Sequence, residues 1–441
     1  MKKLISTLLV GVMTLSLVAC GAPKNPTSTE APAATETTDA AATTETAETT
    51  GTAEVQDVTL KVWSPQVDQT NEEEGGKIGW LNEMLPLFEE AHPEYNITWE
   101  LAVCGEGDAG TLVSNDPAAA ADVFFYANDQ MGALIEAGAL AKLGGSYLET
   151  VQSSYPQVHV DLLTYTDGGV YGFPTAPNTW FMWYNKDVFT EDDIQNIGTM
   201  LEKAKVAFPM DNSWYTGSFL FGVGGTVFGP LGIDPEAGID FSSDLCVKAV
   251  EYMVEMAKNP NFKNDVDGFG VENMKTGKVA AMFSGDWDEP ALREALGDKL
   301  GCAVLPKFTI DGTDYQMKSF AGNKAIGVNP NASNLKAAME LAAFLSTPEA
   351  LMRRQELSGY TPAPTVCAEE DSVKNNPVCV TFNNQMELGV YQSALPEMKH
   401  YWDPVKNLGL NILNGSITAD NAKENLDKTM ELLNSTGISA E

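Results

Sequence analysis

Four places in the chain combine aromatic rings with hydrogen-bonding neighbours near the expected end of a strand or helix. They are Tyr126 with Asp129, Trp214 with Tyr215, Trp287 in FSGDWDEP, and Tyr401 with Trp402. The apolar faces of pyranose rings stack on such side chains, while sugar hydroxyls need charged or amide partners. One aromatic residue is most often part of the core. Four of them in polar, Gly- and Pro-rich contexts favour a sugar-binding site.

The stretch DVFFYANDQMGALIEAGALAKL, residues 122–143, shows how the chain positions one of these groups. Val123–Phe125 predicts a short buried strand, and Met131–Leu143 predicts an amphipathic helix. Ligands of α/β sheets bind outside the carboxyl ends of strands. We therefore expect Tyr126 and Asp129 to face such a crevice, while Phe124 or Phe125 packs into the core.

The surrounding sequence alternates between strand and helix patterns. VTLKVWS, YNITWELAV and ADVFFYA read as strands, and IGWLNEMLPLFEEAHP reads as a helix, which together indicate a mainly parallel α/β sheet. About 387 residues run from Val55 to Glu441, more than one core usually holds, so two lobes are expected. Pro174 and Pro177 keep their segment extended, as a crossing between lobes requires.

The N-terminus predicts export and a lipid anchor. Lys2 and Lys3 precede an uncharged, largely apolar run, Leu4–Val18, and the sequence LVAC ends at Cys20. This pattern is similar to the lipobox of bacterial lipoproteins, with residues 1–20 as signal peptide and Cys20 as the lipidated residue. The alternative is an ordinary secretory signal. Residues 21–54, rich in Thr, Ala and Glu, predict a disordered tether.

Composition excludes several other classes of protein. The formal net charge of −34 argues against nucleic acid or anionic lipid as partners. Three widely spaced histidines and the absence of zinc, phosphate-loop and GxSxG patterns predict no metal, no cofactor and no catalytic residue. The abundant carboxylates leave a two-carboxylate glycosidase open as an alternative. Five cysteines follow Cys20; we expect mostly buried free thiols, with Cys367 and Cys379 as the only pair close enough in sequence to test.

An ordered set of segments resembles a known family over essentially the whole body. The segments are ADVFFYANDQMGALIEAGAL, YGFPTAPNTWFMWYNKDVF, MKTGKVAAMFSGDWDEPAL, CAVLPKF, SFAGNKAIGVNPNA, AAMELAAFLSTPEAL and LPEMKHYW. The chain resembles the lipoprotein-type, extracellular solute-binding proteins of sugar ABC importers, specifically the maltose/maltodextrin-binding group.

This resemblance implies a two-lobed, periplasmic-binding-protein-like α/β fold. Each lobe would hold a mixed, mainly parallel sheet flanked by helices, with a multi-strand hinge between them. Residues 55–176 plus 325–375 would form lobe 1, and residues 177–324 plus 376–441 lobe 2. We expect the crossings near Thr175–Asn178, Phe320–Lys324 and Lys374–Pro377.

The resemblance also assigns ligand contacts by position. Tyr126 stands where the family has a stacking aromatic, and Asp129 where it has a hydroxyl-binding acid. Further contacts are expected from Trp214, Tyr215, Trp287 and Trp402. Asn178 replaces an acid and Gln130 an arginine, which removes charge and affects the exact sugar more than the class. In two loops, Gln66, Asp68, Glu106 and Asp108 are either contacts or solvated loop residues.

The function implied is capture of an oligosaccharide, most specifically a maltodextrin, and its delivery to the permease subunits of an ABC importer. The protein would be lipid-anchored to the cell membrane and face the outside, as on a Gram-positive cell surface. Two alternatives are a secreted carbohydrate-active enzyme, which would shorten maltooligosaccharides, and a surface adhesin, which need not change shape with sugar.

Overall fold

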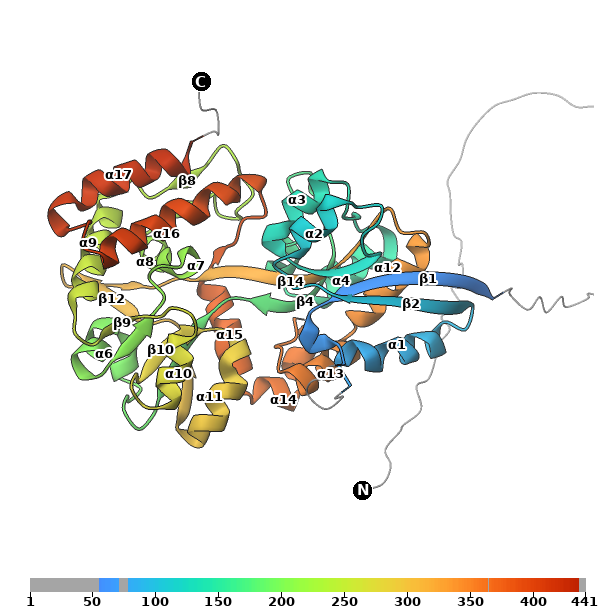
Figure 1. Cartoon of the computed structure of the whole chain (residues 1–441), viewed down its shortest axis with the longest axis horizontal. Helices are drawn as coiled ribbons and strands as arrows, with labels where there is room; N and C mark the ends of the chain where they lie inside the picture. Colours follow the sequence, from blue (N-terminus) through green and yellow to red (C-terminus); the bar gives the residue numbers. More distant parts are fainter. Residues whose placement is uncertain (1–54, 71–77, 364, 436–441) are drawn as a thin grey trace, which may run out of the picture. The chain divides into compact units, whose positions relative to one another are not determined.

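The computed structural model describes residues 55–70, 78–363 and 365–435 (Figure 1). The expected signal peptide, the lipidation site at Cys20 and the tether at 21–54 lie outside these residues. The chain divides into two units, Met1–Thr52 and Ala53–Glu441, and the described residues belong to the second. Among them, no helix combines the length and apolar character needed to cross a membrane.

The first sheet has six strands and is mixed. Its order is β15-β14-β3-β1-β2, with β4 also pairing with β14. β1 runs parallel to β2 and β3, whereas β14 is antiparallel to β3 and β4 and parallel to β15. The alternating side chains Val58, Leu60 and Val62 are all buried, as the strand pattern predicts. The bounds are β1 Gln56–Ser64, β2 Tyr95–Val103, β3 Val123–Ala127, β4 Phe173–Asn178, β14 Phe320–Val328 and β15 Val390–Tyr391.

The second sheet has five strands in the order β11-β5-β10-β6-β9. β6 is parallel to β9 and β10, and β5 is antiparallel to β10 and β11. Two short ribbons, β7–β8 and β12–β13, accompany it. The bounds are β5 Phe181–Asn185, β6 Val206–Phe208, β7 Thr226–Val227, β8 Ile239–Asp240, β9 Phe262–Asn264, β10 Ala281–Ser284, β11 Leu300–Ala303, β12 Lys307–Ile310 and β13 Thr313–Gln316. The mixed α/β class is confirmed.

Helices accompany both sheets. Between the strands of the first sheet, or directly after β14, lie α1 Trp80–Ala91, α2 Ala109–Asn115, α3 Met131–Glu136, α4 Gly145–Ser154, α5 Gln157–Asp161, α12 Leu335–Leu345 and α13 Pro348–Ser358. In the rest of the chain lie α6 Ile197–Lys203, α7 Ser213–Thr216, α8 Ser218–Gly222, α9 Asp244–Lys258, α10 Phe269–Lys275, α11 Glu289–Leu296, α14 Asp371–Lys374, α15 Pro377–Leu388, α16 Lys399–Leu413 and α17 Ala422–Leu433. α15 contacts strands of both sheets.

One expected helix is shorter than its pattern. The spacing of apolar residues in Met131–Leu143 predicts a single helix, but α3 ends at Glu136. Gly138 has φ +65°, a left-handed conformation that commonly ends a helix. The apolar residues beyond it, Leu140 and Leu143, are still buried, so the helical spacing marked a buried face but not the helix length.

Each sheet has its own large apolar core. One core includes Trp80, Phe88 and Phe124, and the other includes Trp180, Met210 and Phe219. The two cores explain why the chain is longer than a single core usually supports. The five described cysteines are free, and all but Cys302 are buried, so Cys367 and Cys379 do not pair.

The segments that pass from one sheet to the other are hydrogen-bonded to each other. Thr179, between β4 and β5, shares a hydrogen bond of 2.7 Å with the Ser319 hydroxyl and donates to the Phe320 carbonyl at 2.6 Å. Gln385 on α15 donates to the same Ser319 hydroxyl at 2.9 Å. All three side chains are buried. The crossings therefore form one connected polar junction.

Candidate ligand-binding site

Polar residues follow three neighbouring strands of the first sheet. The 3₁₀ turn Gln66–Asp68 follows β1, Glu106 follows β2, and the 3₁₀ turn Asn128–Gln130 follows β3. Because β1 is parallel to both β2 and β3, their carboxyl ends meet at one edge of the sheet. This is the edge where ligands of α/β sheets bind.

A buried ion cluster lies at this edge. Arg354 on α13 binds both carboxylate oxygens of Asp68, at 2.9 and 2.6 Å, and Glu106 at 3.3 Å. Arg354 is 1% exposed and Asp68 is fully buried. Burial raises the pKa of Asp68, while Arg354 opposes that rise. The expectation that Asp68 contacts ligand is corrected, because both of its oxygens are occupied below the surface; Gln66 and Asp108 are exposed.

Asp129 is held by its neighbours after β3. It is half-buried, and its Oδ2 accepts a hydrogen bond from Gln130 Nε2 at 2.9 Å. Burial raises its pKa. Asn128 secures the same turn, because its amide accepts from the Asn323 backbone N–H and donates to the Gln392 carbonyl, each at 2.9 Å. The turn that presents Asp129 is thus tied to β14.

Tyr126 does not face a crevice, which corrects the expectation for this residue. Its side chain is 0% exposed, and its hydroxyl donates to the Tyr171 carbonyl. Gly172 has φ +122°, and a Cβ there would lie 2.7 Å from the Tyr126 hydroxyl, so the glycine makes room for the ring. Phe124 and Phe125 are buried as expected. Tyr126 is part of the same core.

Two tryptophans from different elements stack on each other near the second sheet. Trp214 on α7 and Trp287, after β10, have ring centroids 6.0 Å apart and an interplanar angle of 26°. Trp287 is 43% exposed, and Trp214 is half-buried. Tyr215 is buried, with its ring centroid 4.6 Å from that of Trp180. The open indole of Trp287 is a surface on which a sugar ring can stack.

Trp402, on α16, lies in an acidic pocket of about 490 Å³. The neighbouring Tyr401, named above as one of the four aromatic groups, is fully buried and donates to the Ser213 carbonyl at 3.0 Å. That hydrogen bond holds α16 beside the start of α7. The pocket is lined by Asp211, Asn212, Ser213, Asp265, Val266, Asp267, Trp402, Asp403 and Lys406.

Asp286 connects the aromatic residues near the second sheet with the charged residues at the edge of the first sheet. It follows β10 of the second sheet, next to Trp287, and its Oδ2 accepts from the backbone N–H of Thr361 at 3.3 Å. Burial raises its pKa, and Lys324 on β14 opposes the rise. Asn178 is the last residue of β4 and is half-buried opposite Gly322 of β14. Residues of both sheets therefore meet around β14.

Sequence reasoning missed Arg354, Asp286 and the side chain of Lys324 as parts of this region. Lys324 lay in an expected crossing, but no local pattern marked it as a charged group of the site. Arg354 lies within the helical sequence ALMRRQEL, and its partner Asp68 is 286 residues away. The one available signal was the presence of charged residues inside otherwise apolar segments, which predicts a buried pair without identifying the partner.

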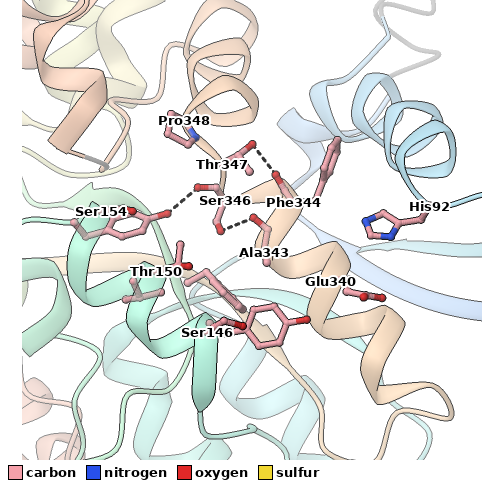
Figure 2. A pocket seen from close by; sticks show the side chains of 14 residues that line it. His92, Ser146, Thr150, Ser154, Glu340, Ala343, Phe344, Ser346, Thr347 and Pro348 are labelled. Carbon is pink, nitrogen blue, oxygen red and sulfur yellow. Dashed lines mark hydrogen bonds between the residues drawn. The ribbon is translucent and has the colours of Figure 1, made fainter. Parts of the chain in front are cut away.

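A separate pocket of about 400 Å³ contains none of these residues (Figure 2). It lies between α4 and α12, and much of its polar rim is satisfied internally; for example, Tyr155 donates to the Ser346 carbonyl at 2.7 Å. Beside it, His92, Glu94 and Glu340 are the one group of potential metal ligands within the described ranges. Lys336 already binds Glu340 at 2.6 Å.

Comparison with known proteins shows the family. The sequence model of the bacterial extracellular solute-binding proteins matches residues 83–380. A galactooligosaccharide-binding protein of Bacillus subtilis (strain 168) is 27% identical over 70% of this chain and 75% of its own length. A maltooligosaccharide ABC transporter solute-binding lipoprotein of Streptococcus pneumoniae (strain ATCC BAA-255 / R6) is 27% identical over 68% of this chain and 73% of its own.

A solved structure with acarbose is similar along nearly the whole described body. It is 38% identical, has a TM-score of 0.80, and the match covers 86% of this chain and 100% of that chain. The family match spans more than half of the sequence, and the sheets, strand ends and aromatic groups described above lie largely within it. This chain belongs to the bacterial extracellular solute-binding proteins.

Proposed function

We propose that this protein captures an oligosaccharide, most specifically a maltodextrin, and delivers it to the permease of an ABC importer. The observation that carries the proposal is the stacked pair of Trp214 and the 43% exposed Trp287. An exposed indole beside carboxylates offers both an apolar face and hydrogen-bond acceptors, which is what a sugar ring requires. Trp402, in its acidic pocket, adds a second aromatic surface of the same kind.

The relatives support an oligosaccharide rather than a single sugar. Their names specify galactooligosaccharide and maltooligosaccharide, and the solved structure has acarbose. We favour the α-glucan, because separate aromatic surfaces at Trp287 and Trp402 suit several consecutive rings of a curved chain. Asp129, Gln130 and Asn178 are proposed as its polar contacts, with Trp214 and Tyr215 supporting the aromatic surface.

Ligand capture is proposed to close two lobes around the sugar. Residues 55–176 with 325–375 form lobe 1 in this proposal, and 177–324 with 376–441 form lobe 2. A ligand that contacts Asp129 from one lobe and Trp287 from the other favours the closed state by its differential affinity. Saturating sugar should then reduce the radius of gyration measured by small-angle X-ray scattering, and an unchanged profile at saturation would contradict closure.

Anchoring and permease delivery complete the proposal. Cys20 would carry the lipid that holds the protein at the outer face of the cell membrane, consistent with a relative named as a lipoprotein. The bound sugar would pass to the permease without being cleaved. The protein therefore acts as a binding component rather than as an enzyme.

One experiment tests the binding claim and separates it from catalysis. Purified protein is titrated calorimetrically with maltose, maltotriose, longer maltodextrins, cyclodextrins and galactooligosaccharides, and each mixture is then analysed for shortened chains. Saturable binding of maltodextrins without cleavage supports the proposal. Preference for galactooligosaccharides would change the sugar, shortened products would indicate an enzyme, and no binding across the panel would contradict the function.

A further inference from the structure

Lys324 is a charged residue in the middle of a buried strand. It lies in β14, opposite Ala127 of β3 and Ala176 of β4, and it is 9% exposed. The Thr175 hydroxyl donates to its backbone carbonyl at 3.0 Å, so the backbone at this position is held firmly. Lysine is rarely buried unless its ammonium group is paired, which raises the question of what Lys324 binds.

The ammonium group has no hydrogen-bond acceptor among the described residues. Its nearest carboxylate oxygen is Glu106 Oε2, at 3.8 Å, which is an ion pair but too long for a hydrogen bond. It also lies 4.2 Å from the centre of the Tyr360 ring, a cation–π contact that uses no acceptor lone pair. With a side chain only 11% exposed, the Lys324 ammonium group has little contact with water. An acceptor supplied from outside would provide a hydrogen bond that the described residues do not.

Glu106 provides a matching acceptor beside it. Its Oε1 accepts from Arg354 Nη2 at 3.3 Å, whereas its Oε2 faces Lys324. The side chains of Glu106 and Lys324 are each 11% exposed, slightly more than Lys324 as a whole residue. Arg354, bound in turn to Asp68, fixes the orientation of the Glu106 carboxylate. Lys324 and Glu106 therefore form a donor–acceptor pair side by side at the carboxyl edge of the first sheet.

We propose that Lys324 and Glu106 bind two neighbouring hydroxyl groups of one sugar ring, Lys324 donating to one oxygen and Glu106 accepting from the other. The assignment rests on the proposed function and adds a specific subsite to it. Hydroxyls on adjacent carbons present an acceptor and a donor side by side, which is the complement of this pair. Both hydrogen bonds are charge-assisted and therefore among the stronger ones available to a sugar.

The surrounding charges select a neutral hydroxyl pair over an anionic ligand. This region contains three carboxylates, those of Asp68, Glu106 and Asp286, and only two cations, Lys324 and Arg354. A ligand carboxylate would add a fourth negative charge. Burial lowers the pKa of Lys324, but Glu106, Tyr360 and Asp286 raise it, and the pKa lies above its usual value. The ammonium group is thus protonated and able to donate at neutral pH.

The test compares Lys324→Met, Glu106→Gln and the double variant by calorimetric titration with the best-binding maltodextrin. We expect each single variant to lose about 10- to 100-fold in affinity. The double variant should lose less than the product of the two single losses, because both residues act on one ring. Lys336→Met, at an exposed lysine that binds Glu340 instead of Glu106, is the matched control and should bind normally.

Wild-type affinity in a folded Lys324→Met variant would overturn the inference, because the sugar would then bind without the Lys324 ammonium group. The proposed function would still stand in that outcome, whereas a wild-type protein that binds no oligosaccharide would contradict the function itself. Circular dichroism and melting report whether each variant folds. If Lys324→Met does not fold, binding of monodeoxy maltotrioses to the wild-type protein and to Glu106→Gln is compared instead. A deoxy position that weakens binding to the wild-type protein but not to Glu106→Gln supports the pair. The absence of any such position overturns the inference.

Discussion

The indole rings of Trp214 and Trp287 lie nearly parallel, with centroids 6.0 Å apart and an angle of 26° between their planes. Trp214 is supported from below, because its backbone carbonyl accepts from Trp180 Nε1 at 3.2 Å. The buried Trp180 thus helps to hold Trp214 in place, and the Trp214 ring in turn packs against the exposed ring of Trp287. This arrangement presents a rigid apolar face at low entropic cost.

Replacing Trp287 by alanine should weaken oligosaccharide binding by about 10- to 100-fold, since burying a large aromatic surface contributes roughly 1.5–3 kcal/mol. The melting temperature without ligand should change little, because the ring is 43% exposed. Calorimetric titration and thermal melting measure the two effects. Trp99→Ala on β2 is the control, with normal affinity expected. Equal affinity in Trp287→Ala and wild type would place the sugar elsewhere.

Alanine variants of Asp129 and Phe125 should show opposite effects, the first on sugar affinity and the second on the free energy of unfolding. Asp129→Ala removes an acceptor for sugar hydroxyls and should cost roughly 1.5–3 kcal/mol of binding, or about one to two orders of magnitude in Kd. Phe125 is fully buried and packs edge-on against Trp80, with centroids 6.1 Å apart. Phe125→Ala should lower the free energy of unfolding by about 3–5 kcal/mol through a cavity. Calorimetry and denaturant unfolding of both variants check this, and normal affinity in Asp129→Ala would make its turn purely structural.

Tyr126→Phe tests whether this ring belongs to the core. The substitution removes the hydroxyl that donates to the Tyr171 carbonyl and should lower the free energy of unfolding by about 1 kcal/mol. Affinity for oligosaccharide should be unchanged, because the side chain is fully buried. Denaturant unfolding and titration measure both quantities. A loss of affinity without a loss of stability would return Tyr126 to the ligand site.

The burial of His159 predicts that the protein loses stability in acid. Burial lowers its pKa to about 4, partly opposed by its hydrogen bond with Asn323, while an unfolded histidine titrates near pH 6.5. Between these values the unfolded state binds a proton that the native state does not, so stability falls as the pH falls from about 6.5 to about 4. The full effect is roughly 3 kcal/mol and is absent above that window.

His159→Gln should remove this component of the pH dependence. Denaturant unfolding at several pH values between 7 and 4 would show a shallower decline in the variant than in the wild-type protein. Below pH 4 the two curves should run parallel, because this residue no longer contributes. Identical curves across the whole range would mean that His159 is not held neutral in the native state.

Cys20→Ala should release the protein into the medium, since the lipid would have no attachment site, while sugar binding remains intact. Fractionation of cells and medium followed by immunoblotting measures the distribution. Cys104→Ala, which changes a buried thiol of the folded body, should stay with the membrane. A Cys20→Ala protein that remains membrane-bound would disprove the lipid anchor.

Local sequence patterns were enough to place the main elements in their approximate order. Alternating residues such as Val58, Leu60 and Val62 identified β1, and the run at Val123–Phe125 identified β3, because the period of apolar residues is a local property of the backbone. The α/β class and the polar residues after β3 followed from those local patterns. The length of α3 did not, since Gly138 ended the helix within a continuing apolar pattern.

Contacts between distant segments, in contrast, set which polar and aromatic side chains are open to a ligand. Tyr126 and Trp287 look equivalent in sequence, yet Tyr126 is buried opposite Gly172 and Tyr171, while Trp287 stacks in the open on Trp214. Asp68 is paired with a residue 286 positions away, whereas Lys324 Nζ lies 3.8 Å from Glu106, its nearest carboxylate among the described residues. Burial and pairing depend on contacts between distant segments, and spacing along the chain carries no information about which segments meet.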